Sequence, residues 1–173
     1  MLVPRDVNNE GIVSFIRFPM QALEPTDPPE VTIHLWNNKG GSCEKSASDI
    51  FISVVNADKN ISGGSNYEGQ EIIDDDLVQA KSDGVEGSGI VDDAQASWTP
   101  IGKTSYLSVG NIPTNCARKI HFRLMSEAGT LTTRALFFLK IRYDYARTQA
   151  YLYLQSTNDH IFAGDRFYGG WFF

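Results

Sequence analysis

The stretch Lys119-Ile120-His121-Phe122-Arg123-Leu124 alternates strictly between polar and apolar residues. A period of two is typical of a β-strand with one face in a core and the other in water, so its three apolar side chains are expected to point inward. Val31–Trp36 alternates in the same way and places Thr32, His34 and Trp36 on its more polar face. Both segments therefore predict half-buried strands.

Other segments have the alternation or the β-branched composition of strands. They are Ile50–Val55, Ala135–Tyr145 and Tyr151–Leu154, and, with weaker patterns, Gly11–Phe18, Asp76–Lys81, Ser97–Ile101 and Ser105–Val109. Tyr151–Leu154 follows a link at residues 146–149, which predicts a hairpin with Ala135–Tyr145. Ile73, Leu77 and Ala80 have helical spacing, but the three aspartates at 74–76 are poor helix-interior residues, so a strand is predicted here too. Glycine-rich turns separate these segments, and together they predict an antiparallel β-sandwich.

We expect one compact domain, because 173 residues suffice to bury roughly 70 % of the unfolded chain's surface. Residues 1–29 are expected to form an N-terminal strand and a Pro-rich arm, residues 30–145 the sandwich, and residues 146–173 a hairpin with an aromatic tail. The Pro-rich part, residues 20–30, is alternatively a long crossover inside the domain.

The composition argues against several classes of protein. The 21 acidic residues exceed the 15 basic ones, and the net charge of -6 argues against nonspecific binding to nucleic acid. No apolar run approaches the roughly 20 residues of a membrane-spanning helix. The first residues, Met1–Asp6, have no basic start followed by an apolar core, so no signal peptide is predicted. In a reducing compartment Cys43 and Cys116 are expected to be free thiols and not a disulfide.

Charge is unevenly distributed along the chain. Residues 1–53 have a net charge of -3, residues 54–100 of -8 and residues 101–173 of +5. Surfaces of opposite sign orient contacts between copies of a protein. The alternative interpretation is that the acidic segments are solvated loops.

No pattern predicts a metal site or a catalytic centre. The acidic residues at 74–76 and 92–93 lack the spacing of a calcium-binding loop. His34, His121 and His160 lie on separate segments without the spacing of zinc ligands. No nucleophile motif is present. We therefore expect no metal, no cofactor and no enzymatic activity.

Two groups of aromatic residues are candidate binding sites. Trp36, Trp98 and Tyr106, with Tyr67, would form a platform for sugar rings, or else belong to the core or an interface. The second group is at the end of the chain, where five of the last seven residues are aromatic: Phe167, Tyr168, Trp171, Phe172 and Phe173. Exposed aromatic clusters promote association, so these five residues are expected to pack on their own domain or, the interpretation we favour, on a neighbouring subunit.

Four segments occur in a familiar order: Trp98–Gly102, Leu107–Pro113, Arg118–Leu124 and Gly129–Tyr143. This order resembles the second half of immunoglobulin-like β-sandwich domains on bacterial surfaces and in tailed-bacteriophage particles, over roughly residues 30–145. The chain is also similar to small virion proteins of phages that lack a signal peptide.

The resemblance implies an all-β fold, an antiparallel sandwich of immunoglobulin-like or jelly-roll-like type. It also implies a non-enzymatic structural subunit of a phage-like virion, in capsid decoration, neck, tail or baseplate. Such a subunit is made in the host cytoplasm, and its partners are further copies and other virion proteins, with no direct role for nucleic acid or membrane. The alternative is a carbohydrate-binding or receptor-recognition module that uses Trp36, Trp98 or Tyr106.

Overall fold

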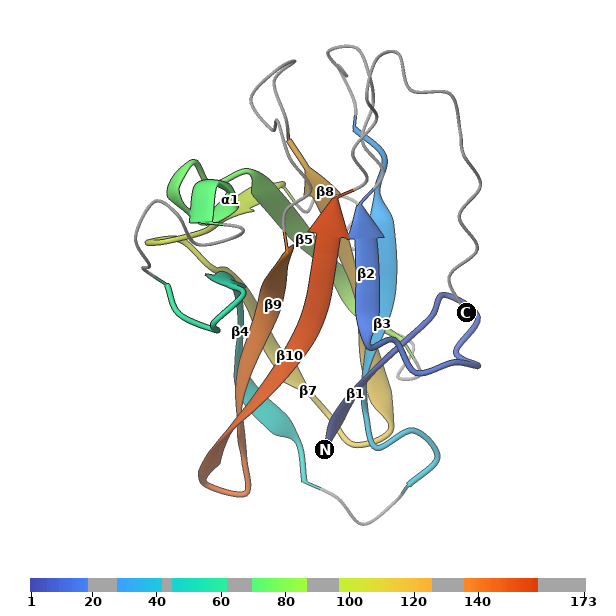
Figure 1. Ribbon diagram of the computed structural model, residues 1–173. Helices are drawn as coiled ribbons and strands as arrows, with labels where there is room; N and C mark the ends of the chain where they lie inside the picture. Colours follow the sequence, from blue (N-terminus) through green and yellow to red (C-terminus); the bar gives the residue numbers. More distant parts are fainter. Residues whose placement is uncertain (19–27, 42–44, 62–69, 87–96, 126–135, 159–173) are drawn as a thin grey trace.

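The computed structural model describes residues 1–18, 28–41, 45–61, 70–86, 97–125 and 136–158. The strands form two five-stranded sheets, here sheet A and sheet B (Figure 1). Sheet A has the order β1 (Leu2–Arg5), β3 (Val31–Asn37), β8 (Cys116–Leu124), β5 (Val78–Glu86) and β6 (Thr99–Ile101). Sheet B has the order β2 (Phe15–Phe18), β10 (Thr148–Asn158), β9 (Leu136–Tyr145), β4 (Ala47–Asn56) and β7 (Leu107–Ile112). The predicted all-β sandwich is confirmed.

The beginning of the chain contributes to both sheets. Strand β1 pairs antiparallel with β3 in sheet A, and the chain then crosses to sheet B, where β2 pairs parallel with β10. Every other strand pair is antiparallel. Strands β1 and β2 are therefore part of the sandwich, and strand β1 is one that the sequence patterns did not predict.

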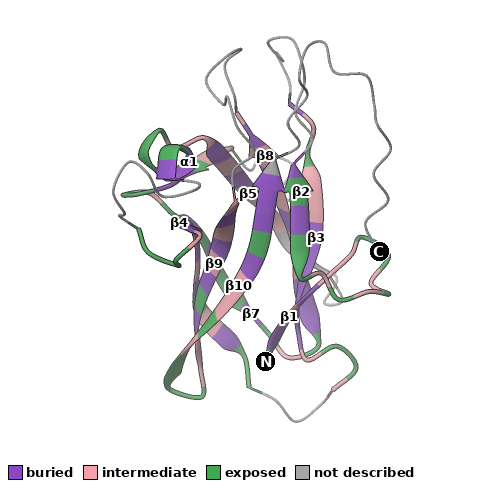
Figure 2. Ribbon diagram, in the orientation of Figure 1, coloured by how far each residue is buried: buried purple, intermediate pink, exposed green. Residues whose placement is uncertain are grey.

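The core lies between the sheets, and buried residues alternate with more exposed ones along much of β8 and β9 (Figure 2). The predicted inward residues of β8, Ile120, Phe122 and Leu124, are at most 3 % exposed. Phe18 of β2 and Phe137 of β9 are fully buried, with ring centroids 5.7 Å apart. Each fully buried apolar side chain of this size stabilises the fold by about 1.5–3 kcal/mol.

The hairpin between β9 and β10 is confirmed, with a shorter link than predicted. Only Ala146 and Arg147 separate the strands, and their φ angles are 51° and 68°. Two successive residues with positive φ are typical of a type I′ turn, whose twist matches that of the strands it joins.

One predicted strand is partly wrong. Residues Gln70–Asp74 form a short helix, α1, and β5 begins only at Val78. The neighbours Ile72 and Ile73 are both fully buried, whereas successive residues of a strand point to opposite faces. The side-chain amide of Gln70 also holds the turn, because it donates to Asp74 Oδ1 at 2.9 Å.

Two further predictions concern the cysteines and the chain end. Cys116 is the first residue of β8, where a turn was expected, and it is a buried free thiol. Cys43, most of the Pro-rich segment and the five tail aromatics from Phe167 to Phe173 lie outside the described residues. Within the described part of the chain, no helix has the length and apolar character needed to cross a membrane.

Candidate functional site

The outer faces of the two sheets carry different side chains. On sheet A, polar and charged residues of β3, β5 and β8 dominate, and we call this surface the polar face. On sheet B, aromatic rings lie beside lysine and arginine, and we call this surface the aromatic–cationic face. It consists of Phe51, Lys59, Tyr106, Phe138, Lys140, Arg142, Tyr151 and Tyr153.

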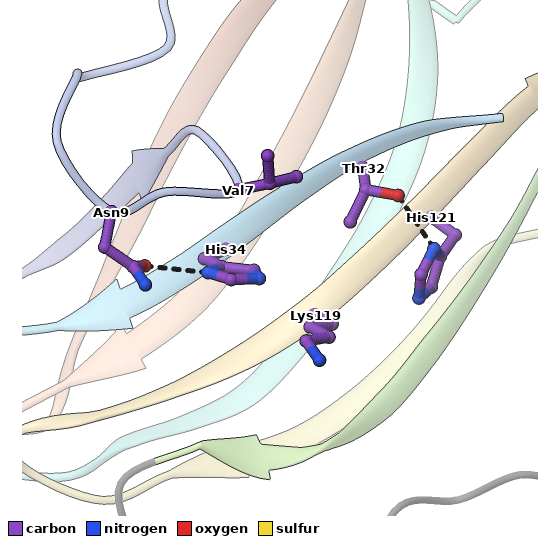
Figure 3. Close-up of a pocket in the computed structure, with 6 residues that line it drawn as sticks. All are labelled: Val7, Asn9, Thr32, His34, Lys119 and His121. Carbon is purple, nitrogen blue, oxygen red and sulfur yellow. Dashed lines mark hydrogen bonds between the residues drawn. The ribbon is translucent and has the colours of Figure 1, made fainter.

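The polar face contains a hollow of about 410 Å³, lined by Val7, Asn9, Thr32, His34, Lys119 and His121 (Figure 3). Its floor follows from strand register, because Thr32 lies opposite His121 and His34 lies opposite Lys119 across β3 and β8. Alternation directs all four side chains outward. The loop after β1 supplies Val7 and Asn9 at the rim.

Asp6 shapes this loop. Its carboxylate accepts backbone N–H bonds from Glu10 at 2.9 Å, from Gly11 at 2.9 Å and from Asn8 at 3.1 Å. The bond from Glu10, followed by that from Gly11, lowers the pKa of Asp6 below its ordinary value, because these bonds stabilise the charged form.

Asn9 fastens the loop to sheet A. Its φ is 61°, a left-handed conformation that asparagine tolerates. Its Oδ1 accepts the indole N–H of Trp36 at 2.5 Å and also contacts His34 Nδ1 at 2.7 Å (Figure 3). The indole nitrogen only donates, so the amide oxygen must face both partners, and His34 must carry a proton on Nδ1. Trp36 and His34 are thereby satisfied although only 9 % and 4 % exposed.

His121 connects three elements of the polar face. Its Nε2 lies 2.6 Å from Asp83 Oδ2, and its Nδ1 lies 2.9 Å from Thr32 Oγ1 and 3.4 Å from Glu30 Oε2. A carboxylate only accepts, so Nε2 carries a proton, and in the neutral ring Nδ1 accepts the Thr32 hydroxyl proton. His121 thus makes ordinary hydrogen bonds on the polar face.

Elsewhere on the polar face, the charged side chains of Lys81 and Arg123 also contact other residues of the protein. Lys81 pairs with Glu30 at 3.4 Å, and Arg123 donates two bonds to the Gln79 side chain. The Trp98 ring lies 4.4 Å from Lys81 Nζ and 4.3 Å from the Arg123 guanidinium. These cations are therefore satisfied by partners within the protein.

On the aromatic–cationic face, the cations contact rings. The Arg142 guanidinium lies 4.5 Å from the Phe51 ring, which meets Tyr106 edge-to-face at 5.0 Å. Lys140 Nζ lies 4.8 Å from the Tyr151 ring. Lys59 Nζ lies 5.0 Å from the Tyr153 ring and 5.5 Å from Phe138. The ion pairs among the described residues lie on the polar face and beside α1, and not on the aromatic–cationic face.

Helix α1 lies at one end of the sandwich (Figure 1), and acidic residues are clustered in it and directly after it. Glu71, Asp74 and Asp75 are exposed, and we call them the acidic turn. Lys103 Nζ lies 3.4 Å from Asp74 Oδ1. The acidic middle segment of the sequence thus contributes an exposed negative patch distinct from the aromatic–cationic face.

The predicted sugar platform is not brought together. Trp36 is covered by Asn9, Trp98 contacts two cations on the polar face, and Tyr106 lies on the opposite sheet against Phe51. Tyr67 and the tail aromatics lie outside the described residues.

Sequence reasoning missed the hollow. It placed His34 and His121 on separate segments and gave no role to Asn9, Thr32 or Lys119. Alternation predicts that all but Asn9 point away from the core, but only the register of β3 against β8 shows that they meet. Among the described residues, no group of three or more His, Cys, Asp or Glu side chains is placed to hold a metal ion.

No protein-family model matches the chain, and no curated protein matches it. Among solved structures, the CupB2 chaperone of Pseudomonas aeruginosa is 12 % identical with a TM-score of 0.41, and covers 84 % of this chain and 53 % of its own. A family 123 glycoside hydrolase from Clostridium perfringens is 8 % identical with a TM-score of 0.44, and covers 91 % of this chain and 27 % of its own. The CooA pilin subunit of enterotoxigenic Escherichia coli is 8 % identical with a TM-score of 0.36, at 91 % and 95 % coverage. The chain thus spans about half the chaperone and about a quarter of the hydrolase, and at these TM-scores we draw no functional conclusion from the similarities.

Proposed function

We propose that this protein is a non-enzymatic structural subunit of a phage-like virion, acting in capsid decoration, neck, tail or baseplate by assembling with further copies and with other virion proteins. The observation that carries the proposal is the aromatic–cationic face. Tyr106 and Tyr151 on this face are 56 % and 48 % exposed, and Phe15 on the neighbouring edge strand is 41 % exposed. Aromatic residues and arginine are enriched at the centres of protein interfaces.

The occupant that we propose for this face is the acidic turn of a second copy. Lys59, Lys140 and Arg142 give the face a positive charge that Asp144 on the same side of β9 only partly offsets. Glu71, Asp74 and Asp75 supply the opposite sign, and among the described residues the cation paired with them is Lys103. Complementary potentials orient association and set its register.

A contact between two different patches has consequences for the assembly. After the contact forms, the two copies together keep one unused face and one unused turn, so further subunits add until a ring closes or a filament grows. This behaviour suits a repeated element of a particle. Phe51, Tyr106 and Tyr151 would lose their water contact at such a junction.

A matched pair of charge reversals tests the proposal. Lys140→Glu changes the aromatic–cationic face, and Lys45→Glu makes the same charge change at an exposed residue before β4. We expect sedimentation velocity to show concentration-dependent association for the wild type and for Lys45→Glu, at least tenfold weaker for Lys140→Glu. A strict monomer at high concentration, or equal association of both variants, would contradict the proposal.

The chain end offers a second test. The tail aromatics are a second proposed contact with a neighbouring subunit, so deletion of Tyr168–Phe173 should leave a folded chain that associates more weakly than the wild type. Circular dichroism and sedimentation distinguish this result from an unfolded chain, which would assign the tail to the core of its own domain.

A second candidate function, recognition of a carbohydrate, is favoured by a different observation. The hollow on the polar face brings an amide, a hydroxyl, two imidazoles and an ammonium group within one small volume. Binding of a glycan in an array or a pull-down would support it, and a complete lack of sugar dependence would contradict it.

A further inference from the structure

We propose that two buried amide side chains, those of Asn56 and Gln70, are positioning residues for the contact between copies. They join Lys59 of the aromatic–cationic face to Asp74 of the acidic turn, so the two halves of the contact keep one fixed arrangement within each copy. This inference rests on the proposed function, which supplies the contact, and it adds the residues that hold the two halves together.

Asn56 holds the turn of residues 56–60, here called the Lys59 turn. It is the last residue of β4 and is fully buried. Its side-chain Oδ1 accepts backbone N–H bonds from Asn60 at 2.9 Å and from Asp58 at 3.1 Å. Its backbone closes the same turn, because its N–H donates to Asn60 O and its C=O accepts from the Lys59 N–H, both at 2.9 Å. Lys59, whose φ is 62°, is thereby held with its ammonium group 5.0 Å from the Tyr153 ring.

Gln70 lies between Asn56 and the acidic turn. It is the first residue of α1 and is only 2 % exposed. Its Oε1 accepts a bond from Asn56 Nδ2 at 3.2 Å. Its Nε2 donates to Asp74 Oδ1 at 2.9 Å and to Ile61 O at 3.4 Å. A series of hydrogen bonds therefore runs from the Lys59 turn to the acidic turn through two side chains that are shielded from water.

The direction of these hydrogen bonds is fixed at both ends. The backbone N–H groups of Asp58 and Asn60 only donate, so the Asn56 amide must turn its oxygen towards them and its nitrogen towards Gln70. The Asp74 carboxylate only accepts, so Gln70 must turn its nitrogen towards it and its oxygen towards Asn56. Turning either amide over would leave buried groups unsatisfied, so the pair has one arrangement.

Both ends of the series keep groups that a neighbouring copy can reach. Among the described residues, Gln70 and Lys103 both contact Oδ1 of Asp74, at 2.9 Å and 3.4 Å, which leaves Oδ2 for a cation of the partner. The Asp74 side chain is 44 % exposed. Lys59 is also exposed, and within the described part of the chain its side chain contacts aromatic rings and not a carboxylate.

A rigid connection matters for a contact between two different patches. Each inner copy of the assembly uses its acidic turn towards one neighbour and its aromatic–cationic face towards the next, so the angle between the two patches determines whether a ring closes. Buried amides with one arrangement fix this angle before the copies meet, and preorganised groups lose less entropy on binding. Breaking the pair should therefore weaken association although neither amide touches the neighbour.

The first experiment tests the connection within one copy, by amide NMR spectra of the full chain at a concentration where it is monomeric. Asp74→Asn removes the charge to which Gln70 donates, and the control Glu71→Gln removes one charge from the same acidic turn. We expect Asp74→Asn to shift the side-chain amide signals of Asn56 and the backbone N–H signal of Asn60 further than the control does. Equal shifts from the two variants, or shifts that end at Gln70, would overturn the proposal.

The second experiment measures association by sedimentation velocity. Asn56→Asp keeps the oxygen that faces the Lys59 turn and loses the donor to Gln70. The control is Asn37→Asp, because Asn37 is also fully buried and its Nδ2 donates to two backbone carbonyls near the beginning of β4, at the opposite end of that strand. We expect association about fivefold weaker for Asn56→Asp and unchanged for Asn37→Asp.

Urea unfolding shows whether each variant folds, and Gln70→Glu, which loses the donor to Asp74, replaces Asn56→Asp if that chain is unfolded. Undiminished association of the folded variant, or an equal loss in Asn37→Asp, would overturn the positioning role. If Lys140→Glu still weakens association in that case, the proposed function stands without it. A wild type that stays monomeric would overturn the proposed function, and the NMR comparison then decides by itself whether the two amides connect the turns.

Discussion

The outer faces of sheets A and B carry similar numbers of cations but satisfy them differently. On sheet A, Lys81, His121 and Arg123 contact carboxylates or an amide, and a loop anchored by Asn9 covers part of the strand surface. On sheet B, Lys140 lies over the exposed ring of Tyr151 and Arg142 lies over the partly buried ring of Phe51. This difference shows that the number of charged residues alone does not identify a binding surface; the partners of those charges within the protein also matter. A cation with an internal carboxylate has little to offer a large partner, whereas a cation on a ring can still pair with an acid.

The two sheets share one hydrophobic core. We expect the largest loss of stability when a side chain in this core is removed. Phe137→Ala removes a fully buried ring and should lower the free energy of unfolding by about 3–5 kcal/mol. Its neighbour Phe138 points outward, so Phe138→Ala should cost only about 1 kcal/mol through lost contacts with Lys59 and Tyr153. Urea unfolding followed by tryptophan fluorescence, with Trp171→Phe as the common background, reports on sheet A through Trp36 and Trp98. An unchanged tryptophan transition in Phe137→Ala would show that the sheets are independent.

The polar face depends on Asn9. Asn9→Ala leaves the donors of Trp36 and His34 without their acceptor, and we expect a loss of about 2 kcal/mol in chemical denaturation. Asn9→Gly removes the same amide but suits the φ of 61°, so it should be about 1 kcal/mol less destabilising. If both variants match the wild type within about 0.5 kcal/mol, the loop is not held as described.

The aromatic–cationic face contains a contact that a double-mutant cycle isolates. Arg142→Met and Phe51→Leu, alone and combined, should give a coupling energy of about 0.5–1 kcal/mol in the free energy of unfolding. The contact is partly exposed, which limits its strength. A coupling energy of zero would mean that the guanidinium does not stay over the ring.

The smallest expected effect is a pH dependence of stability, which arises from Asp6 in the loop at the rim of the hollow. Asp6 has a lowered pKa in the folded protein, mainly through the backbone N–H of Glu10. A depressed folded pKa contributes stability above the unfolded value near 3.8, and this contribution is lost as the pH falls through the folded value. We therefore expect Asp6→Asn to destabilise the protein at pH 7 and to have less effect at pH 2, as measured by thermal melting. An equal effect at both pH values would contradict the role of the charged form.

Much of the fold could be predicted from the sequence, because alternation in Val31–Trp36 and Lys119–Leu124 gives the face of the sheet on which each side chain lies. In β3 the burial departs from this alternation, because the loop with Asn9 also covers His34 and Trp36. Strand β1 and helix α1 could not be predicted. The four residues of β1 are too few for a period, and α1 depends on the burial of Ile72 and Ile73 against other elements.

The sites could be predicted less well than the fold. Alternation gives the outward direction of Thr32 and Lys119, but the hollow also requires the register of two strands distant in sequence and the position of Asn9. The sequence left two interpretations open for Trp36 and Trp98, a platform for sugar rings or a place in the core or an interface. The structure satisfies them internally, through an amide and two cations.

The most direct test of the account follows the aromatic NMR signals of the protein as its concentration is raised. If copies associate through sheet B, the signals of Tyr106, Tyr151 and Phe15 should shift or broaden, while those of Trp98 and His121 on sheet A stay constant. Concentration-dependent changes at Trp98 and His121 with constant tyrosine signals, or no change at all up to millimolar protein, would contradict the claim that sheet B carries the assembly surface.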